Sequence, residues 1–267
     1  MITINRLGNL GRLANQMFQY ASLKGIATNR GYDFSIPPRE LFGIEDTNVK
    51  RSDVILYDVF NRVEQNNNKS IQQTNVLWER RHDFDEELFN NCPDNIDLVG
   101  YFQTEKYFKH IENEIREDFT FDEELLSNCK SFITDNFDTE IISLHIRRGD
   151  YVVNPNHPTQ SLSYYSEALS RLKSDLPVII FSDDPQWCKE QELFSDDRFV
   201  ISENNTTDAD LCLMSLCDYH IIANSSFSWW GAWLAKSKQV IAPKNWFGGE
   251  CAGKSTADVP FGNFEFL

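Results

Sequence analysis

The chain contains no hydrophobic run that approaches the roughly 20 apolar residues of a membrane-spanning helix. Its first residues, MITINRLGNLGRLANQMF, also lack the charged and then apolar pattern of a secretory signal peptide. Positive charge is scarce, because 25 lysines and arginines stand against 41 aspartates and glutamates. A formal net charge of -16 argues against nucleic acid as a partner and against a strongly basic membrane-binding surface. We therefore expect a cytoplasmic protein, at most peripheral to the inner membrane.

The cysteines form no recognisable framework, because they are scattered, with no CxxC pair and no histidine-rich segment. The chain has six, which are Cys92, Cys129, Cys188, Cys212, Cys217 and Cys251. This spacing favours free thiols over disulfides or zinc ligands. The glycine-rich patterns GxxxxGK[ST] and GxGxxG are missing too, which argues against P-loop and dehydrogenase-type enzymes.

From about residue 140 the sequence contains a regular alternation of apolar strands and helices. The strands IISLHI, PVIIFS, DYHIIAN and KQVIAP are interleaved with the helical patterns SYYSEALSRLK, DDPQWCKEQELF, TDADLCLMSL and SWWGAWLAK. Buried strands that alternate with helices predict a parallel sheet covered on both faces. Ligands of such sheets bind beyond the carboxyl ends of the strands.

The first half predicts a second unit of related design. MITIN predicts a short strand, and the glycine-rich turn and NQMFQYASLKGIATNRG after it predict a helix that ends at a glycine. The polar stretch from 60 to 75 predicts an exposed loop. Residues 95–119 predict a strand followed by a long charged helix, and residues 122–140 predict a further helix and a hinge.

One stretch places three basic side chains at a predicted strand end, in IISLHIRRGDYVV, residues 141–153. Side chains alternate along a strand, so His145 and Arg147 share one face and Arg148 points away. We expect Arg148 to pair with Asp150 and brace the loop. The two groups that remain call for an anionic partner, most naturally a phosphate or diphosphate. His145 and Arg147 are therefore candidate ligands of such an anion.

Two aspartates follow the next strand, in FSDDP, residues 181–185. Asp184 before Pro185 predicts a helix start, with the aspartate as N-cap and the proline in the first helical position. Asp183 is left without such a role, and a carboxylate at a strand end can accept two hydrogen bonds from the N–H groups of a guanine. A role in the loop alone remains the alternative for Asp183.

Hydroxyl and amide side chains crowd the turn before the tryptophan-rich helix, in ANSSFSWWGAWLA, residues 223–235. Free backbone N–H groups and the helix dipole at such a turn favour an anion. The candidate residues are Asn224, Ser225, Ser226, Phe227 and Ser228. Ser228 is also the expected N-cap. The tryptophans at positions 229, 230 and 233 lie at helical spacing, which favours core packing over sugar stacking.

The stretch GRLANQMFQY, residues 11–20, opens the first predicted helix. Gly8 and Gly11 suit a tight turn. Asn15 and Gln16 are candidates for capping the helix and for hydrogen bonds to a hydroxyl-rich ligand such as a sugar. The pattern is not GxGxxG, so it gives little support for a dinucleotide.

The motifs HIRRGDYV, FSDDP, DLCLMSLCDYHIIANSSFSWWGAWLA, VIAPKNWF, GYFQTEKYF and GRLANQMFQYA resemble the motif set of the alpha-1,2-fucosyltransferase family, of the glycosyltransferase family 11 type. The resemblance extends from about residue 8 to 247, and the combination of HxRRGDY with SSFSWWGAW is specific. One departure is Ala14, which stands where family members usually have glycine. Alanine is tolerated there if its φ is negative.

The resemblance implies an α/β fold of the GT-B type, in which two Rossmann-like domains enclose a cleft. Residues 1–138 would form the acceptor-side domain, and Asn15 and Gln16 would lie on that side. Residues 139–267 would form the domain that binds GDP-fucose.

The resemblance also assigns roles around the donor. It places Arg147 against the donor diphosphate, Asp183 near guanine, and the turn from Ser226 to Ser228 near the phosphates. The residues that would support this site are Arg148, Asp150 and Asp184.

The implied reaction transfers L-fucose from GDP-beta-L-fucose to the 2-hydroxyl of a glycan acceptor, most naturally a galactosyl residue, with inversion. Arg147, His145 and the helix N-terminus after Ser228 would stabilise the negative charge on the departing GDP. We expect no metal, because an arginine can neutralise the charge that a divalent ion neutralises elsewhere. The alternatives are a glycosyltransferase with another GDP-sugar or linkage, and a non-catalytic nucleotide-sugar-binding protein. The sequence assigns no general base.

Overall fold

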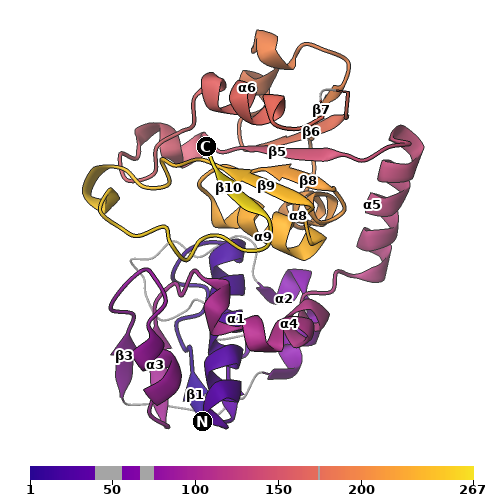
Figure 1. Ribbon diagram of the computed structural model, residues 1–267. Helices are drawn as coiled ribbons and strands as arrows, with labels where there is room; N and C mark the ends of the chain where they lie inside the picture. The colour runs from indigo at the N-terminus through magenta and orange to yellow at the C-terminus, as the bar shows by residue number, and fades with distance from the viewer. Residues whose placement is uncertain (40–55, 67–74, 174) are drawn as a thin grey trace. The chain divides into compact units, whose positions relative to one another are not determined.

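The computed structural model describes residues 1–39, 56–66, 75–173 and 175–267, which form two compact α/β units (Figure 1). The first unit comprises Met1–Asp122 with Ser255–Val259, and the second comprises Glu123–Lys254 with Pro260–Leu267. This division lies before the predicted boundary at residue 138. Helix α5 (Glu123–Asn136) belongs to the second unit because it packs on α8 (Thr207–Ser215) of that unit.

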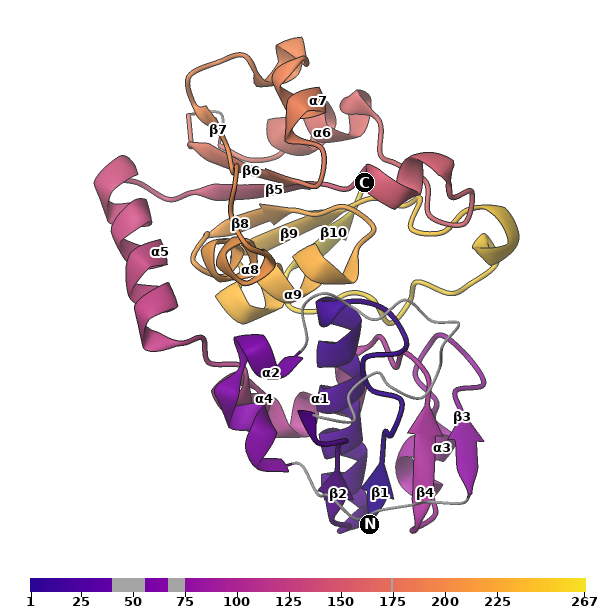
Figure 2. The ribbon, with the colours of Figure 1, turned by 180° about the vertical axis from the view of Figure 1, so that it is seen from behind.

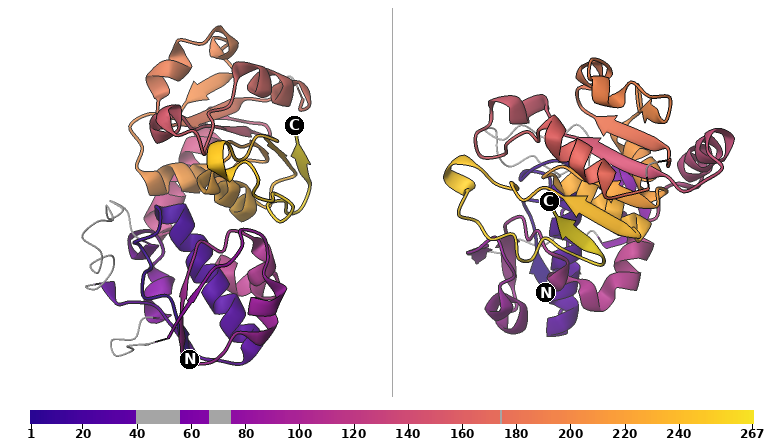
Figure 3. Two further views of the ribbon diagram at one scale, coloured as in Figure 1. Left: turned by 90° about the vertical axis from the view of Figure 1, so that its left-hand side faces the viewer. Right: turned by 45° about the horizontal axis from the view of Figure 1, so that its top comes forward.

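The first unit contains a parallel sheet of four strands in the order β2-β1-β4-β3. Its described elements are β1 (Ile2–Thr3), α1 (Leu13–Arg30), β2 (Phe34–Ser35), α2 (Leu56–Val59), the 3-10 helix η2 (Asn61–Asn66), β3 (Val76–Trp78), α3 (Glu86–Asn91), β4 (Ile96–Val99), the 3-10 helices η3 (Glu105–Tyr107) and η4 (Lys109–Ile111), and α4 (Glu112–Asp118). The long helix α1 lies against this sheet (Figures 2 and 3).

The two ends of α1 follow the predicted glycine signals. Gly8 and Gly11 precede the helix with φ angles of 89° and 85°, which a side chain would disfavour. Gly31 ends it in the left-handed region with φ 67°, and its N–H bonds to the carbonyl of Thr28 at 3.2 Å. Ala14 lies in the first turn of α1 and is not among the described residues with positive φ. The alanine therefore causes no backbone strain.

The predicted long charged helix after β4 is wrong, because the structure has three short helices there, η3, η4 and α4. Phe102 has a φ of 51°, and Phe108 has φ -129° and ψ 6°, neither of which continues an α-helix. Both side chains are fully buried. The burial of these two aromatic rings therefore outweighs the helical periodicity of the charged residues around them.

The predicted loop from 60 to 75 is only partly described. Residues 61–66 form η2, whereas residues 67–74 lie outside the described part of the chain. Four short strands were not predicted at all, namely β2, β3, β7 (Phe199–Ile201) and β10 (Phe264–Phe266). Strands of two or three residues carry too few positions to show a periodicity.

The second unit contains a parallel sheet of six strands in the order β10-β9-β8-β5-β6-β7. Its remaining elements are β5 (Ile142–Ile146), the 3-10 helix η5 (Gly149–Val153), α6 (Leu162–Ser170), β6 (Val178–Ser182), α7 (Pro185–Lys189), the 3-10 helix η6 (Glu192–Phe194), β8 (Tyr219–Ile221), α9 (Ser226–Ala235), β9 (Gln239–Ala242) and the 3-10 helix η7 (Gly249–Cys251). The strands β5, β6, β8 and β9 confirm the predicted alternation.

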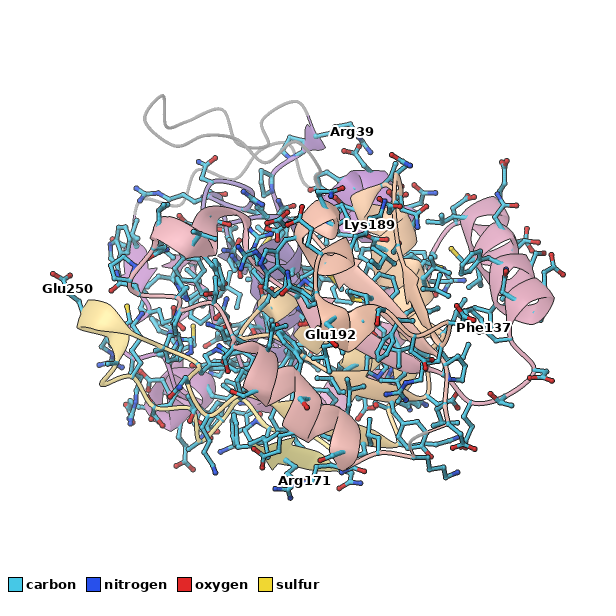
Figure 4. All side chains as sticks on the ribbon, turned by 90° about the horizontal axis from the view of Figure 1, so that it is seen from above. Arg39, Phe137, Arg171, Lys189, Glu192 and Glu250 are labelled. Carbon is cyan, nitrogen blue, oxygen red and sulfur yellow. The ribbon has the colours of Figure 1, made fainter. Side chains whose placement is uncertain are left out.

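Helices cover both faces of this sheet. Figures 1 and 2 show α6 and α7 on one face and α8 and α9 on the other. The buried strands β5 and β6 form the middle of the core with the aromatic rings of α6. Charged side chains cover the outer surface, as Arg171, Lys189 and Glu192 show (Figure 4). No helix among the described residues combines the length and the apolar character that crossing a membrane requires.

The order of the strands creates a topological switch point between β5 and β8. From β5 the chain continues through β6 to β7 on one side, and then returns to β8 and β9 on the other. The loops that follow β5 and β8 therefore diverge at the carboxyl edge, which is where doubly wound sheets bind ligands.

Gly25 on α1 allows a close approach of the chain at η3 and η4. A Cβ atom on this glycine would lie 2.0 Å from the carbonyl oxygen of Tyr107. Alanine stabilises a helix interior by about 1 kcal/mol relative to glycine, but overpacking against a backbone atom costs about 1–3 kcal/mol. We expect Gly25→Ala to lower the free energy of unfolding by up to about 2 kcal/mol, as measured by denaturant titration. Gly253→Ala, with open space around its Cβ, is the control, and a more stable Gly25→Ala would contradict this packing.

The buried His220 on β8 should make the stability of the second unit sensitive to acid. The ring is fully buried, Nε2 donates to the carbonyl of Met214 at 2.8 Å, and Nδ1 lies 2.8 Å from the hydroxyl of Ser237. Burial lowers the pKa of His220 from 6.5 to about 4. Between these two values the unfolded chain binds the proton and the native chain does not, so acid favours unfolding.

We expect the free energy of unfolding to fall as the pH decreases from about 6.5 to about 4. The contribution of His220 amounts to roughly 3 kcal/mol at the acid end. Denaturant titrations across this range should show a shallower decline for His220→Gln. If that variant does not fold, imidazole NMR of the wild type decides the question, and a His220 ring that is protonated at pH 6 would disprove the assignment.

Candidate functional site

The predicted anion-binding stretch lies at the switch point of the second unit. Strand β5 ends at Ile146, and Arg147 is the next residue. Helix α9 begins at Ser226, five residues after the end of the neighbouring strand β8. The topology therefore brings the first and the third predicted clusters to one edge of the sheet.

His145 is a neutral side chain that joins β5 to α9. It is 5% exposed, its Nδ1 lies 2.8 Å from the hydroxyl of Ser228, and its ring packs against Phe227. Burial, together with the positive charge of Arg147, lowers the pKa of His145 to about 3. The expectation that His145 adds a second positive charge is therefore wrong. Burial in the sheet excludes the water that an imidazolium would need.

Arg147 supplies the positive charge of the site. Its Nη1 lies 2.8 Å from Oδ2 of Asp183, and its Nη2 forms an ion pair with Oδ1 of Asp150. The guanidinium carbon lies 5.3 Å from the centre of the Tyr151 ring, and the side chain is 16% exposed. The arginine is thus held on two sides by carboxylates and on one face by an aromatic ring.

The predicted pair between Arg148 and Asp150 is wrong. Asp150 instead forms an ion pair with Arg147, three residues earlier. Arg148 instead donates from Nε to Asp184 at 3.0 Å, and its guanidinium lies 4.1 Å over the ring of Trp187. Arg148 therefore braces the loop, as expected, but against α7.

The two aspartates after β6 have different partners. Asp184 is the N-cap of α7, as predicted, and accepts a hydrogen bond from the N–H of Trp187 at 3.2 Å. Asp183 has a role that the sequence analysis missed, because its Oδ1 accepts from the N–H of Arg148 at 2.8 Å while Oδ2 contacts Arg147. The contact of Asp183 with guanine stays a prediction.

The turn into α9 is capped differently from the prediction. Ser225 is the N-cap and accepts a hydrogen bond from the N–H of Phe227 at 3.3 Å. Ser228 lies in the first turn, where its hydroxyl contacts His145. The N-cap must precede the first helical residue, and the extended backbone of Ser225 meets this condition. Ser226 is the first helical residue, so the turn places it at the end where helices attract anions.

Asn224 was a candidate donor ligand, but the structure uses its side chain to connect loops. It is 3% exposed, its amide donates to the carbonyl of Trp246 at 3.0 Å, and its Oδ1 accepts from Gln160 at 3.1 Å. The ring hydroxyl of Tyr151 donates to the Asn224 carbonyl at 3.2 Å. The predicted core role of the helix tryptophans is confirmed, because Trp229, Trp230 and Trp233 are at most 2% exposed.

The two acceptor-side candidates in the first unit lie in different surroundings. Asn15 is partly exposed, and its Oδ1 accepts a hydrogen bond from Gln103 at 2.6 Å. Gln16 is fully buried, and its Oε1 accepts from the N–H of Leu56 at 2.8 Å. Gln16 therefore supports the start of α2 as a structural residue, which corrects the prediction that it contacts a sugar. Neither residue caps α1, whose N-cap is Arg12 without a side-chain hydrogen bond.

Tyr151 and Trp187 are the site residues that the sequence analysis missed. Each presents a ring to one of the two arginines after β5. Cation–π contacts of this kind hold a guanidinium in place while its edge stays open for hydrogen bonds. The tyrosine follows directly after Asp150 in RRGDY, so its position in the motif was a usable signal. The tryptophan is 39 residues from its arginine, and only the fold reveals the contact.

The arrangement suits an anion better than a metal. Within the described ranges no group of three or more His, Cys, Asp or Glu side chains could hold a metal ion. Asp183 and Asp184 are each engaged by an arginine. Arg147 and the N-terminal end of α9 together provide a positive charge and backbone donors for phosphate oxygens. Independence of metal stays a prediction.

Comparison with known proteins identifies relatives along almost the whole chain. The sequence pattern of "Glycosyl transferase family 11" matches residues 1–259. An alpha-1,2-colitosyltransferase of Escherichia coli is 32% identical over 279 residues, which cover 92% of each chain. Galactoside alpha-(1,2)-fucosyltransferase 2 of Bos taurus is 26% identical over 90% of this chain and 70% of its own length.

Solved structures with the same fold are also found. POFUT1 in complex with GDP has a TM-score of 0.54 at 13% identity, covering 88% of this chain and 94% of its own. Fucosyltransferase NodZ from Bradyrhizobium has a TM-score of 0.55 at 15% identity, covering 93% and 96%. These likenesses confirm the predicted α/β fold of the GT-B type.

The fold alone does not distinguish one glycosyltransferase family from another. The motif set around Arg147 and α9 narrows the choice, and the family pattern spans both units. The chain therefore belongs to glycosyl transferase family 11.

Proposed function

We propose that this protein transfers L-fucose from GDP-beta-L-fucose to the 2-hydroxyl of a galactosyl residue in a glycan, with inversion. The observation that carries the proposal is the guanidinium of Arg147 directly after β5, at the sheet edge where His145 joins β5 to the first turn of α9, in a chain of family 11. The names of curated relatives, galactoside alpha-(1,2)-fucosyltransferases among them, support the linkage and the acceptor class.

The chemistry of this site is the stabilisation of a leaving group. As the bond between the sugar and GDP breaks, negative charge grows on the phosphate oxygen that leaves. Arg147 remains positively charged throughout, whereas His145 is neutral and offers no charge. The arginine and the backbone N–H groups of α9 therefore carry the electrostatic stabilisation. His145 contributes by fixing the first turn of α9 through Ser228.

A second candidate donor follows from one observation. The relative that matches 92% of this chain is named as a colitosyltransferase. Transfer of a colitosyl group from a GDP-linked donor, with the same 1,2 linkage, would use the same charges. The third reading, a non-catalytic binding protein, has less support, because Ala14 lies in a regular helical turn and gives no sign of a degraded loop.

The first test measures GDP release from GDP-fucose and, separately, from GDP-colitose, with and without a panel of beta-galactosides, with products identified by mass and linkage. Acceptor-dependent release with fucose at the 2-position is the expected result. Release only from GDP-colitose would establish the second donor. Tight binding of GDP-fucose without transfer to any acceptor would support the non-catalytic reading.

Arg147→Ala should lower kcat about 100- to 1,000-fold, the usual effect of removing one donor to a developing oxyanion. Arg171→Ala is the matched control, because Arg171 is an exposed arginine of the same unit that pairs with Glu167 and Glu265. Circular dichroism should show that both variants remain folded. Near-normal turnover of Arg147→Ala would exclude the arginine from the reaction.

Chelation of divalent ions should leave the rate unchanged, since Arg147 supplies the positive charge. The measurement is kcat after dialysis against EDTA and after addition of Mg²⁺ or Mn²⁺. Loss of activity in EDTA that either ion restores would show that the reaction needs a metal.

A further inference from the structure

Arg147 does not present a free guanidinium to a ligand, because two carboxylates already contact it from different sides. We propose that these carboxylates have opposite effects. Asp183 is a positioning residue that holds Arg147 in the orientation the donor needs, whereas Asp150 is an internal counter-charge that the donor diphosphate displaces. The inference rests on the proposed function, since it concerns the same phosphate site.

Asp183 is held from three directions. Its Oδ1 accepts the N–H of Arg148 at 2.8 Å, and its Oδ2 contacts Nη1 of Arg147 at 2.8 Å. A Cβ atom on Gly149 would lie 2.3 Å from the same Oδ2, so the glycine leaves the space that the carboxylate fills. A carboxylate with a backbone donor on one oxygen and a guanidinium on the other cannot turn away without losing both. Asp183 therefore sets the direction in which Arg147 points.

Asp150 is held much less firmly. Its side chain is 52% exposed, against 26% for Asp183. Its only ion pair in the described part of the chain is the one with Nη2 of Arg147. When this contact opens, water can hydrate the carboxylate at little cost. Asp150 is thus the partner that an incoming phosphate can replace.

A diphosphate brings at least two negative charges to the guanidinium. If Asp150 stays in place, it repels them, and if it leaves, the ion pair with Arg147 is lost. Either route makes the charge of Asp150 unfavourable for binding. If charge alone mattered, Asp183 would also weaken binding, because it is a second carboxylate on the same guanidinium. If the two substitutions change the Kd in opposite directions, charge alone cannot explain both effects, and Asp183 must act by positioning Arg147.

The experiment is isothermal titration of GDP and of inorganic pyrophosphate into the wild type and the variants. Asp150→Asn should lower the Kd about two- to fivefold, the range expected for an exposed ion pair. Asp183→Asn should raise the Kd about tenfold, and lower kcat with GDP-fucose, although it also removes a negative charge. Glu167→Gln, an exposed carboxylate that pairs with Arg171, measures the effect of charge at a distance.

Gly149→Ala tests the positioning without any change of charge. The new methyl group would lie 2.3 Å from Oδ2 of Asp183, too close for contact, and would push the carboxylate from Arg147. This variant should raise the Kd for pyrophosphate in the same direction as Asp183→Asn. Gly253→Ala, where a Cβ meets no atom within 4 Å, is the matched control and should bind as the wild type does.

The outcomes separate this inference from the proposed function. If the wild type binds pyrophosphate but not GDP or GDP-fucose, the donor is wrong, and the variants still test the inference with pyrophosphate. If the wild type binds neither, both ideas fail. Weaker binding by Asp150→Asn would overturn the opposite roles, and so would tighter binding by Asp183→Asn beyond the effect of Glu167→Gln. A Gly149→Ala variant that binds like Gly253→Ala would also overturn them.

Discussion

The ion pair between Arg147 and Asp183 is the interaction on which the site depends. It joins the residue after β5 to the residue after β6, and so connects the ends of two neighbouring strands. The backbone N–H of Arg148 and the bare Cα of Gly149 complete the contact. The RRG part of the motif therefore has three distinct tasks. One arginine carries the charge, the next anchors the loop, and the glycine leaves room for a carboxylate from another strand.

The site works with one permanent positive charge because its histidine is neutral. His145 lies in the sheet, where an imidazolium would lose its hydration, and the charge of Arg147 opposes protonation further. The ring instead positions the first turn of α9 through Ser228. A phosphate at this edge would meet the arginine and the backbone donors of the first turn of α9. Under the proposed function, this unit would stabilise the leaving group of the donor.

The first unit shows how a motif residue can be structural. Gln16 belongs to GRLANQMFQY but is fully buried and supports α2, whereas Asn15 beside it is partly exposed and bonds to Gln103 after β4. The neighbouring loop contains Phe102 with a positive φ, and the backbone N–H groups of Tyr101 and Phe102 both donate to the carboxylate of Glu79. The same motif therefore supplies one buried support for α2 and one partly exposed amide.

Local chemistry by itself determined several features of this protein. The alternation of strands and helices, the glycines around α1, the N-cap at Asp184 and the buried tryptophans of α9 each depend on residues a few positions apart. Only the tertiary structure decided the partners of the charged groups. Asp183 meets arginines 36 and 35 residues away, and His145 meets a serine 83 residues away. Such contacts depend on which strands are neighbours and on how much water burial removes, and neither is encoded in a short stretch of sequence.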